Sequence, residues 1–127
     1  MSWRILYVDD ENDLREVAQM SLELDPELEV LSCSSGASAL LELPVWKPDL
    51  VLLDVMMPGM DGPATLQRIR QTAEGQDLPI VFLTAKAMPG DRESSLAAGA
   101  SDYVTKPVDL DELLATIASW VGAGERS

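Results

Sequence analysis

The chain of 127 residues contains no histidine and a single cysteine, Cys33. Without histidine it cannot build a Ser-His-Asp triad, a histidine metal site or a phosphohistidine of its own. A single cysteine excludes an intramolecular disulfide, and its place at the end of the run Val30-Leu31-Ser32-Cys33 is typical of a buried, unreactive thiol. Basic residues are also few, and the net charge of −13 disfavours direct binding to nucleic acid or to anionic lipid.

Long apolar runs are missing as well. No run approaches the roughly 18 apolar residues that a membrane-spanning helix needs, and no signal peptide is recognisable. We therefore expect a cytoplasmic protein without a membrane partner. Residues 1–122 are expected to form one domain, and residues 123–127 a short polar tail that is frayed.

Short apolar runs alternate with helical patterns along the whole chain, which is typical of repeated βα units. The expected strands cover residues 4–8, 29–33, 50–53, 80–83 and 102–104. The expected helices cover residues 14–24, 37–43, 63–73, 91–98 and 110–121. The third and fourth strands lack polar alternation, as in strands covered on both faces. The pattern predicts an α/β fold: a doubly wound, five-stranded parallel sheet of order 2-1-3-4-5 in a flavodoxin-like three-layer sandwich.

Several helix ends can be predicted from the sequence. Asn12 or Asp13 is expected to cap the first helix, whose apolar stripe with Leu14 and Val17 should face the sheet. Gly75 is expected to end the third helix, and Asp109 to cap the last.

Polar residues stand where the expected strands end. Asp9 and Asp10 follow the first strand, Asp54 the third, Thr84 the fourth, and Lys106 comes after the fifth. The carboxyl ends of neighbouring parallel strands share one crevice, so these side chains should converge there. Three carboxylates close together are costly without a cation, and oxygen-only ligands suit Mg²⁺. A carboxylate in such a site can attack a phosphoryl donor to form an acyl phosphate, with the ammonium and the hydroxyl beside the transferring group.

The order and spacing of these residues resemble a response-regulator receiver domain, the CheY-like phosphoacceptor module of two-component signalling. The resemblance covers residues 3–121. Its pieces are Asp9-Asp10, Asp54 followed by Met57-Pro58-Gly59-Met60-Asp61-Gly62, Thr84-Ala85, and Tyr103 three residues before Lys106-Pro107.

The resemblance implies a role for each matching residue. Asp54 corresponds to the phosphoacceptor and Asp10 to a direct Mg²⁺ ligand, while Asp9 would act on the metal mainly through water. Asp54 and the backbone carbonyl of Met56 would complete the metal site.

The remaining roles also follow from the resemblance. Thr84 and Tyr103 would form the switch, and Lys106 would pair with the phosphoryl group. The bond before Pro107 would be cis. Met56 and Lys86 stand at the two positions that tune hydrolysis of the phosphoaspartate in such proteins.

The resemblance implies a regulator that accepts a phosphoryl group from a sensor histidine kinase or a phosphotransfer protein. Because only one helix follows Lys106, we expect a single-domain regulator. The net charge of −13 favours docking to a downstream target protein, and we expect a homodimer in the phosphorylated state. Two alternatives stay open: a receiver module of a longer hybrid kinase or regulator, and an interaction module that works without phosphorylation.

Two functions outside this family fit the sequence less well. An aspartyl-phosphate phosphatase needs a second acid two residues after its nucleophile, and Met56 cannot transfer a proton. A flavodoxin-like cofactor site needs a neutral loop after the first strand, whereas Asp9-Asp10-Glu11 would repel a phosphate. The resemblance implies a phosphoacceptor that assists its own phosphorylation and slow dephosphorylation, and we expect it to be neither a dedicated phosphatase nor another kind of enzyme.

Overall fold

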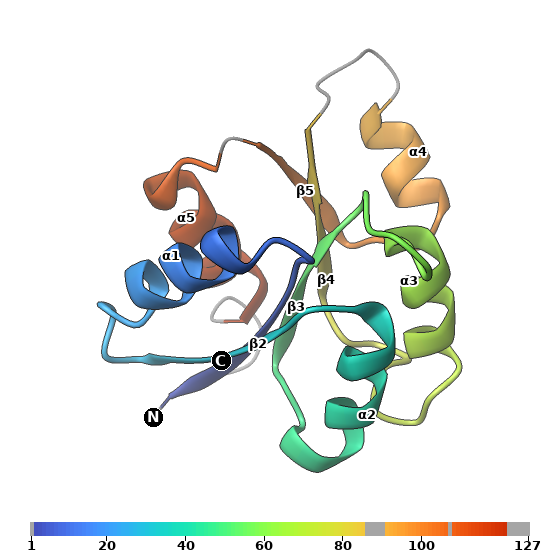
Figure 1. Ribbon diagram of the computed structural model, residues 1–127, viewed down its shortest axis with the longest axis horizontal. Coiled ribbons are helices and arrows are strands. Elements are labelled where there is room, and N and C mark those ends of the chain that lie inside the picture. The colour runs from blue at the N-terminus through green and yellow to red at the C-terminus, as the bar shows by residue number, and fades with distance from the viewer. Residues whose placement is uncertain (1, 86–90, 107, 122–127) are drawn as a thin grey trace.

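The computed structural model describes residues 2–85, 91–106 and 108–121, and Figure 1 shows their arrangement. The strands are β1 (Trp3–Val8), β2 (Leu28–Cys33), β3 (Leu50–Asp54), β4 (Ile80–Thr84) and β5 (Asp102–Thr105). The helices are α1 (Asn12–Leu22), α2 (Gly36–Trp46), α3 (Gly62–Arg70), α4 (Asp91–Ala97) and α5 (Leu110–Val121). The predicted alternation of strands and helices is confirmed.

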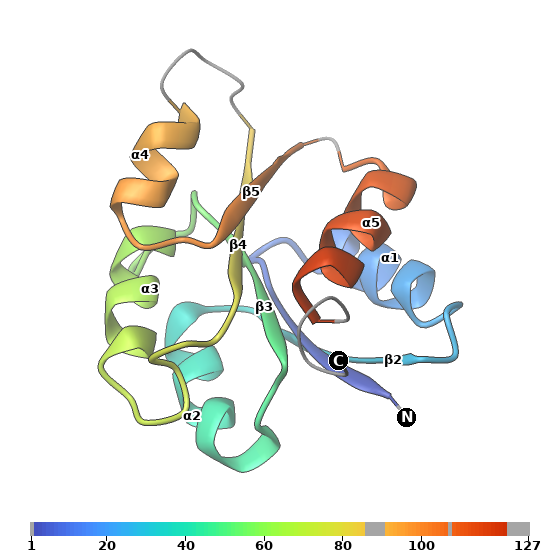
Figure 2. The same ribbon diagram turned by 180° about the vertical axis from the view of Figure 1, so that it is seen from behind.

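All neighbouring strands are parallel, and the sheet has the predicted order β2-β1-β3-β4-β5. Figures 1 and 2 show three layers, with α1 and α5 on one face of the sheet and α2, α3 and α4 on the other. The helices change face between α1 and α2 and again between α4 and α5 (Figure 1). The strand order reverses at β1, so β1 and β3 lie side by side at this point. In open α/β sheets this is the place where ligands bind.

Two apolar cores hold the layers together because successive side chains of a strand point to opposite faces. On β1, Ile5 and Tyr7 belong to the core below α1 and α5, and Leu6 and Val8 to the core below α2 and α3. All five residues of β3 are buried, which explains why its sequence shows no polar alternation. The Asp54 carboxylate therefore sits at the end of a fully covered strand.

The expectations for α1 are partly wrong. Glu11 occupies the N-cap position, and no side chain caps this helix. Leu14 and Val17 remain 40% and 61% exposed, although both were expected to face the sheet. The reason is that they border an open groove between α1 and α5 instead of packing inside the core. The predicted cap of α5 is confirmed, because an Asp109 carboxylate oxygen accepts a hydrogen bond from the N–H of Asp111 (2.9 Å).

The third helix is shorter than predicted, since α3 ends at Arg70 and not near Gly75. The Arg70 guanidinium donates hydrogen bonds to the backbone carbonyls of Gly75 (2.7 Å) and Leu78 (2.6 Å), so the chain after α3 folds back against the helix end. A Cβ atom at Gly75 would lie 2.1 Å from the Ile69 carbonyl oxygen. Glycine is needed there for this close approach of two backbone segments, and not to terminate the helix.

Candidate functional site

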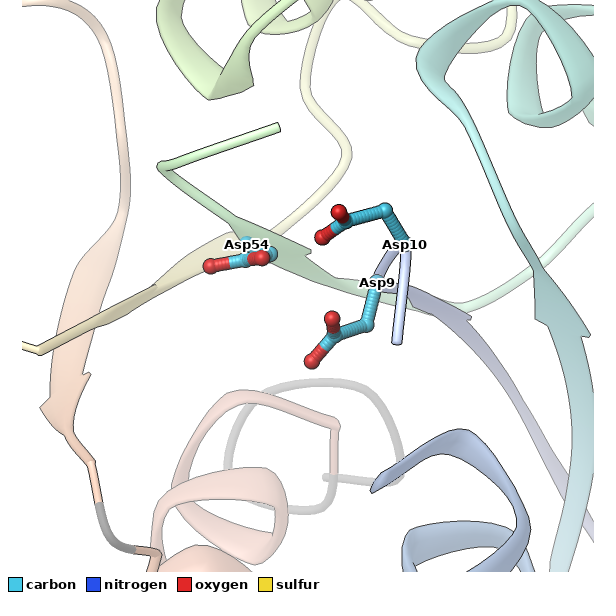
Figure 3. Close-up of side chains that lie close together, drawn as sticks. All are labelled: Asp9, Asp10 and Asp54. Carbon is cyan, nitrogen blue, oxygen red and sulfur yellow. The ribbon is translucent and has the colours of Figure 1, made fainter. Parts of the chain in front are cut away.

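Three aspartates meet at the carboxyl ends of β1 and β3. Asp54 is the last residue of β3, and Asp9 and Asp10 follow β1, the neighbouring strand in the sheet. One carboxylate oxygen of each lies within 4.8 Å of the others, and Figure 3 shows the three carboxylates gathered there. Asp9 is fully buried and Asp54 is 4% exposed, whereas Asp10 is exposed to solvent. The predicted convergence of the three acids is confirmed.

Lys106 joins this cluster from the loop after β5. Its Nζ lies 3.1 Å from Asp9 Oδ2 and 3.2 Å from Asp54 Oδ1, so one ammonium bridges two buried carboxylates. The Lys106 N–H donates to the Thr84 carbonyl (2.7 Å), which ties the end of β5 to the end of β4. Burial alone would lower the pKa of Lys106, but its hydrogen bond to Asp9 and the negative charges of Asp54 and Asp9 raise it above its usual value. Lys106 therefore remains protonated and positively charged beside the carboxylates.

The Asp54 carboxylate is not fully compensated by this ammonium. Burial raises its pKa, and the negative charge of Asp9 adds to the effect, while Lys106 acts in the opposite direction. The N–H of Met56 also donates to Asp54 Oδ1, over 3.4 Å. The net result is a raised pKa, which means that the ionised form is held at a cost and that a further cation would lower this cost.

The donor set fits a hard divalent cation. All three ligand groups are carboxylates, and the exposed Asp10 leaves one side of the cluster open to solvent. Mg²⁺ prefers oxygen ligands and keeps several of its waters, so an open acidic site of this kind suits it. The position of Met56 beside Asp54 agrees with the expected fourth ligand, although the role of its carbonyl stays a prediction.

Of the other predicted residues, Thr84 lies at the same end of the sheet, Tyr103 lies further back on β5, and the rest are outside the described residues. Thr84 is the last residue of β4, and Tyr103 lies on β5, paired with Phe82 and packed against the core below α2 and α3. Both side chains are partly buried, and their switch roles stay predictions. Lys86, Pro107 and the tail 123–127 are outside the described residues.

The loop between β3 and α3 packs closely against the site. The Gly62 N–H donates to the Val55 carbonyl (3.0 Å). A Cβ atom at Gly62 would lie 2.7 Å from the Asp54 carbonyl oxygen and 2.8 Å from Val55 Cα. Gly62, the first residue of α3, therefore has to be glycine, because it meets the backbone of Asp54 and Val55 there.

One residue of the site was missed in the sequence. The Tyr7 hydroxyl donates to Asp9 Oδ2 over 3.4 Å, and Tyr7 is 3% exposed. The signal was present, because Tyr7 and Asp9 are two residues apart and so point to the same face of the sheet. It was overlooked because an aromatic residue in a strand is ordinarily read as part of the core.

The sequence matches known proteins over nearly its full length. The model of the response regulator receiver domain matches residues 5–118. The response regulator MprA of Mycobacterium tuberculosis (strain H37Rv) is 44% identical over 115 residues, which are 91% of this chain and 49% of MprA. The response regulator Rre1 of Synechocystis sp. (strain PCC 6803) is 38% identical over 123 residues, 97% of this chain and 53% of Rre1. The chain thus spans about half the length of these curated relatives.

Solved structures show the same fold. The chemotaxis protein CheY4 of Vibrio cholerae superposes with a TM-score of 0.87 at 28% identity, covering 94% of this chain and 99% of CheY4. The receiver domain of the sensor histidine kinase PA1611 of Pseudomonas aeruginosa superposes with a TM-score of 0.86 at 32% identity, covering 96% and 99%. That structure has a magnesium ion coordinated in its active-site cleft.

Among the residues that the structure describes, none of the helices has both the length and the apolar character of a membrane span.

The fold, the acidic cluster with its bridging lysine and the match over residues 5–118 agree with one another. The chain therefore belongs to the family of response regulator receiver domains.

Proposed function

We propose that this chain accepts a phosphoryl group on Asp54 from a phosphohistidine and then binds a partner protein through a changed surface. The observation that supports it most is the Asp54 carboxylate at the open end of the sheet, with the Lys106 ammonium 3.2 Å away. An Asp54 oxygen would attack phosphorus while the bond from phosphorus to the imidazole nitrogen breaks, and the imidazole takes the electron pair of that bond.

Charge neutralisation would account for most of the rate of this transfer. Asp9, Asp10 and Asp54 would hold Mg²⁺, which would neutralise charge on the phosphoryl oxygens when bound. The Lys106 ammonium, already placed between Asp9 and Asp54, would move from these carboxylates to the phosphoryl oxygens. Thr84, at the end of β4, would offer its hydroxyl to the same group, and Tyr103 on β5 would follow this movement.

The same geometry supports a slow rather than a rapid loss of the phosphoryl group. Rapid hydrolysis would need a general base to activate water beside the phosphoaspartate. Met56 lies two residues after Asp54, with its N–H directed at the Asp54 carboxylate, and its 74% exposed side chain carries no transferable proton. We infer a phosphoacceptor that assists its own reactions, and not a dedicated phosphatase.

The partners follow from the donor chemistry and the charge. The phosphoryl donor would be a sensor histidine kinase or a phosphotransfer protein, and the net charge of −13 favours a protein target over DNA. The chain would act as a single-domain regulator that forms a homodimer when phosphorylated. The alternative, a receiver module of a longer regulator, is supported by the curated relatives, since this chain spans about half of their length.

Phosphorylation of Asp54 can be tested by intact-mass measurement after incubation with phosphoramidate and Mg²⁺. The unmodified chain should gain the mass of one phosphoryl group, and Asp54→Asn should gain none, because an amide oxygen is a poor nucleophile. Asp13→Asn is the matched control, since Asp13 is exposed in the first turn of α1 and lies outside the cluster. Equal labelling of Asp54→Asn and the unmodified chain would contradict the proposal.

A further inference from the structure

We propose that Tyr7 is a positioning residue for phosphoryl transfer: its hydroxyl holds Asp9 so that Lys106 stays shared between Asp9 and Asp54. This inference deepens the proposed function and rests on it. It concerns a residue for which neither the family match nor the spacing of the acids indicates a role.

The contacts of Asp9 explain why its geometry matters. Asp9 Oδ1 accepts a hydrogen bond from the Glu11 N–H (3.0 Å). From the described residues, Asp9 Oδ2 accepts one hydrogen bond from Lys106 Nζ (3.1 Å) and one from the Tyr7 hydroxyl (3.4 Å). Because Asp9 is fully buried, water does not compete for these oxygens, and its orientation depends on these donors. The Tyr7 hydroxyl is the donor that competes with Lys106 for the same oxygen.

Tyr7 is suited to this task because it remains a neutral donor. A phenol is a neutral hydrogen-bond donor at neutral pH, so the hydroxyl can donate to the Asp9 carboxylate without adding charge. Its ring packs in the core below α1 and α5, where a phenylalanine would meet the same packing need. The hydroxyl is therefore the part of Tyr7 that the core does not require, and Asp9 is the partner that it has in the structure.

Tyr7 and Lys106 approach Asp9 from the same side. Both line a groove of about 520 Å³ between α1 and α5, whose other walls are almost entirely apolar. Asp10, by contrast, lies on the solvent-exposed side of the cluster. The two donors of Asp9 Oδ2 therefore reach it from residues that line this groove, and the exposed Asp10 carboxylate is left for a metal ion and its waters.

The consequence for the reaction is a weaker hold of Asp9 on Lys106. An oxygen that already accepts a phenol hydrogen bond attracts the ammonium less strongly than one that does not. Lys106 is then freer to move toward a phosphoryl group on Asp54. Without the hydroxyl, Asp9 should retain Lys106 more firmly, and it should also become a stronger ligand for a hydrated cation.

The test uses Tyr7→Phe, which keeps the ring and removes the hydroxyl. At saturating Mg²⁺, the rate of phosphorylation by phosphoramidate should fall about three- to tenfold, the effect expected for one hydrogen bond. Leu52→Val is the matched control, since Leu52 is the neighbour of Tyr7 on β3 and belongs to the same core. It should lower the melting temperature and leave the rate unchanged. An unchanged rate in Tyr7→Phe would overturn the inference.

A double-mutant cycle separates positioning from packing. Asn at position 9 still offers an acceptor to Tyr7, but it carries no charge that could hold Lys106. In the Asp9→Asn background, Tyr7→Phe should therefore have no further effect on the rate. An equal loss in both backgrounds would show that Tyr7 acts through packing alone, and this would also overturn the inference.

A second measurement keeps this test distinct from that of the proposed function. If the unmodified chain takes up no phosphoryl group, the proposed function fails, and the same four proteins are titrated with Mg²⁺ alone in a calorimeter. Tyr7→Phe should then bind Mg²⁺ several-fold more tightly, and this gain should vanish in Asp9→Asn. Equal Mg²⁺ affinity in Tyr7→Phe and the unmodified chain would refute the positioning role in that case.

Discussion

Replacement of Lys106 by methionine should expose how strongly the fold depends on the charge balance of the site. Methionine keeps most of the apolar stem of lysine and removes the ammonium. Asp9 and Asp54, which are 0% and 4% exposed, would then lose the cation at 3.1 and 3.2 Å. Among the described residues, no other cation forms an ion pair with either carboxylate, so two adjacent buried negative charges would remain.

The magnitude follows from the burial of the three groups. Removal of one partner from a buried ion pair typically destabilises a protein by about 3–5 kcal/mol. Lys106 is 17% exposed, so the lower end of this range, about 3 kcal/mol, is expected in the absence of metal. A saturating cation should reduce this loss, because Lys106→Met leaves both carboxylates free to bind it, and each tenfold gain in affinity over the unmodified chain contributes about 1.4 kcal/mol.

The assay is urea unfolding at neutral pH, in EDTA and in excess Mg²⁺. Lys47→Met is the matched control, since Lys47 is an exposed lysine at the end of α2. It should change the free energy of unfolding by less than about 0.5 kcal/mol. The double variant with Asp54→Asn should recover part of the loss from Lys106→Met, because it removes one of the uncompensated charges.

The pH dependence of the free energy of unfolding provides an independent check on the role of Lys106. The pKa of Asp54 is raised in the folded state, so this carboxylate takes up a proton at a higher pH in the folded protein than in the unfolded chain. The free energy of unfolding therefore increases as the pH falls through the pKa of the folded state. Lys106 lowers this pKa, and its removal should raise the pKa further. Lys106→Met should therefore gain more stability than the unmodified chain as the pH falls from neutrality. A loss no larger than that of Lys47→Met, with an unchanged pH profile, would refute this reasoning.

Two further predictions concern the surroundings of the site. Gly62→Ala should destabilise the fold by about 3 kcal/mol in urea unfolding, because its Cβ would lie 2.7 Å from the Asp54 carbonyl oxygen. Gly59→Ala meets no atom within 4 Å and should lose only the roughly 1 kcal/mol of its positive φ of 77°, and equal losses would contradict the packing argument. Burial raises the pKa of the Cys33 thiol to about 11. The native protein at about pH 8 should therefore resist a thiol reagent and react only on unfolding, and rapid labelling of the native protein would contradict this.

The sequence by itself determined the class of fold and the position of the acids along the chain. Apolar runs and helical periods are local signals, and the rules for parallel βα units leave few ways to arrange five of them. The sheet order and the meeting of Asp9, Asp10 and Asp54 could therefore be predicted, because neighbouring parallel strands bring their carboxyl ends together.

The tertiary structure alone decided which of these groups are buried and which contact one another. Asp9 and Asp10 are identical neighbours in the sequence, yet one is fully buried and the other exposed, because they leave the strand on different sides. The exposure of Leu14 and Val17 likewise depends on the spacing of α1 from α5, which no local pattern encodes.

The contacts within the site are long-range and side-chain specific. Lys106 reaches Asp9 across 97 residues of sequence, and the Tyr7 hydroxyl reaches the same carboxylate from within the core. Periodicity indicates the face on which a side chain lies, but not the atom that it contacts. The strand pattern therefore predicted where the carboxylates meet. Only the tertiary structure decided that the Lys106 ammonium contacts both Asp9 and Asp54 and that the Tyr7 hydroxyl contacts Asp9.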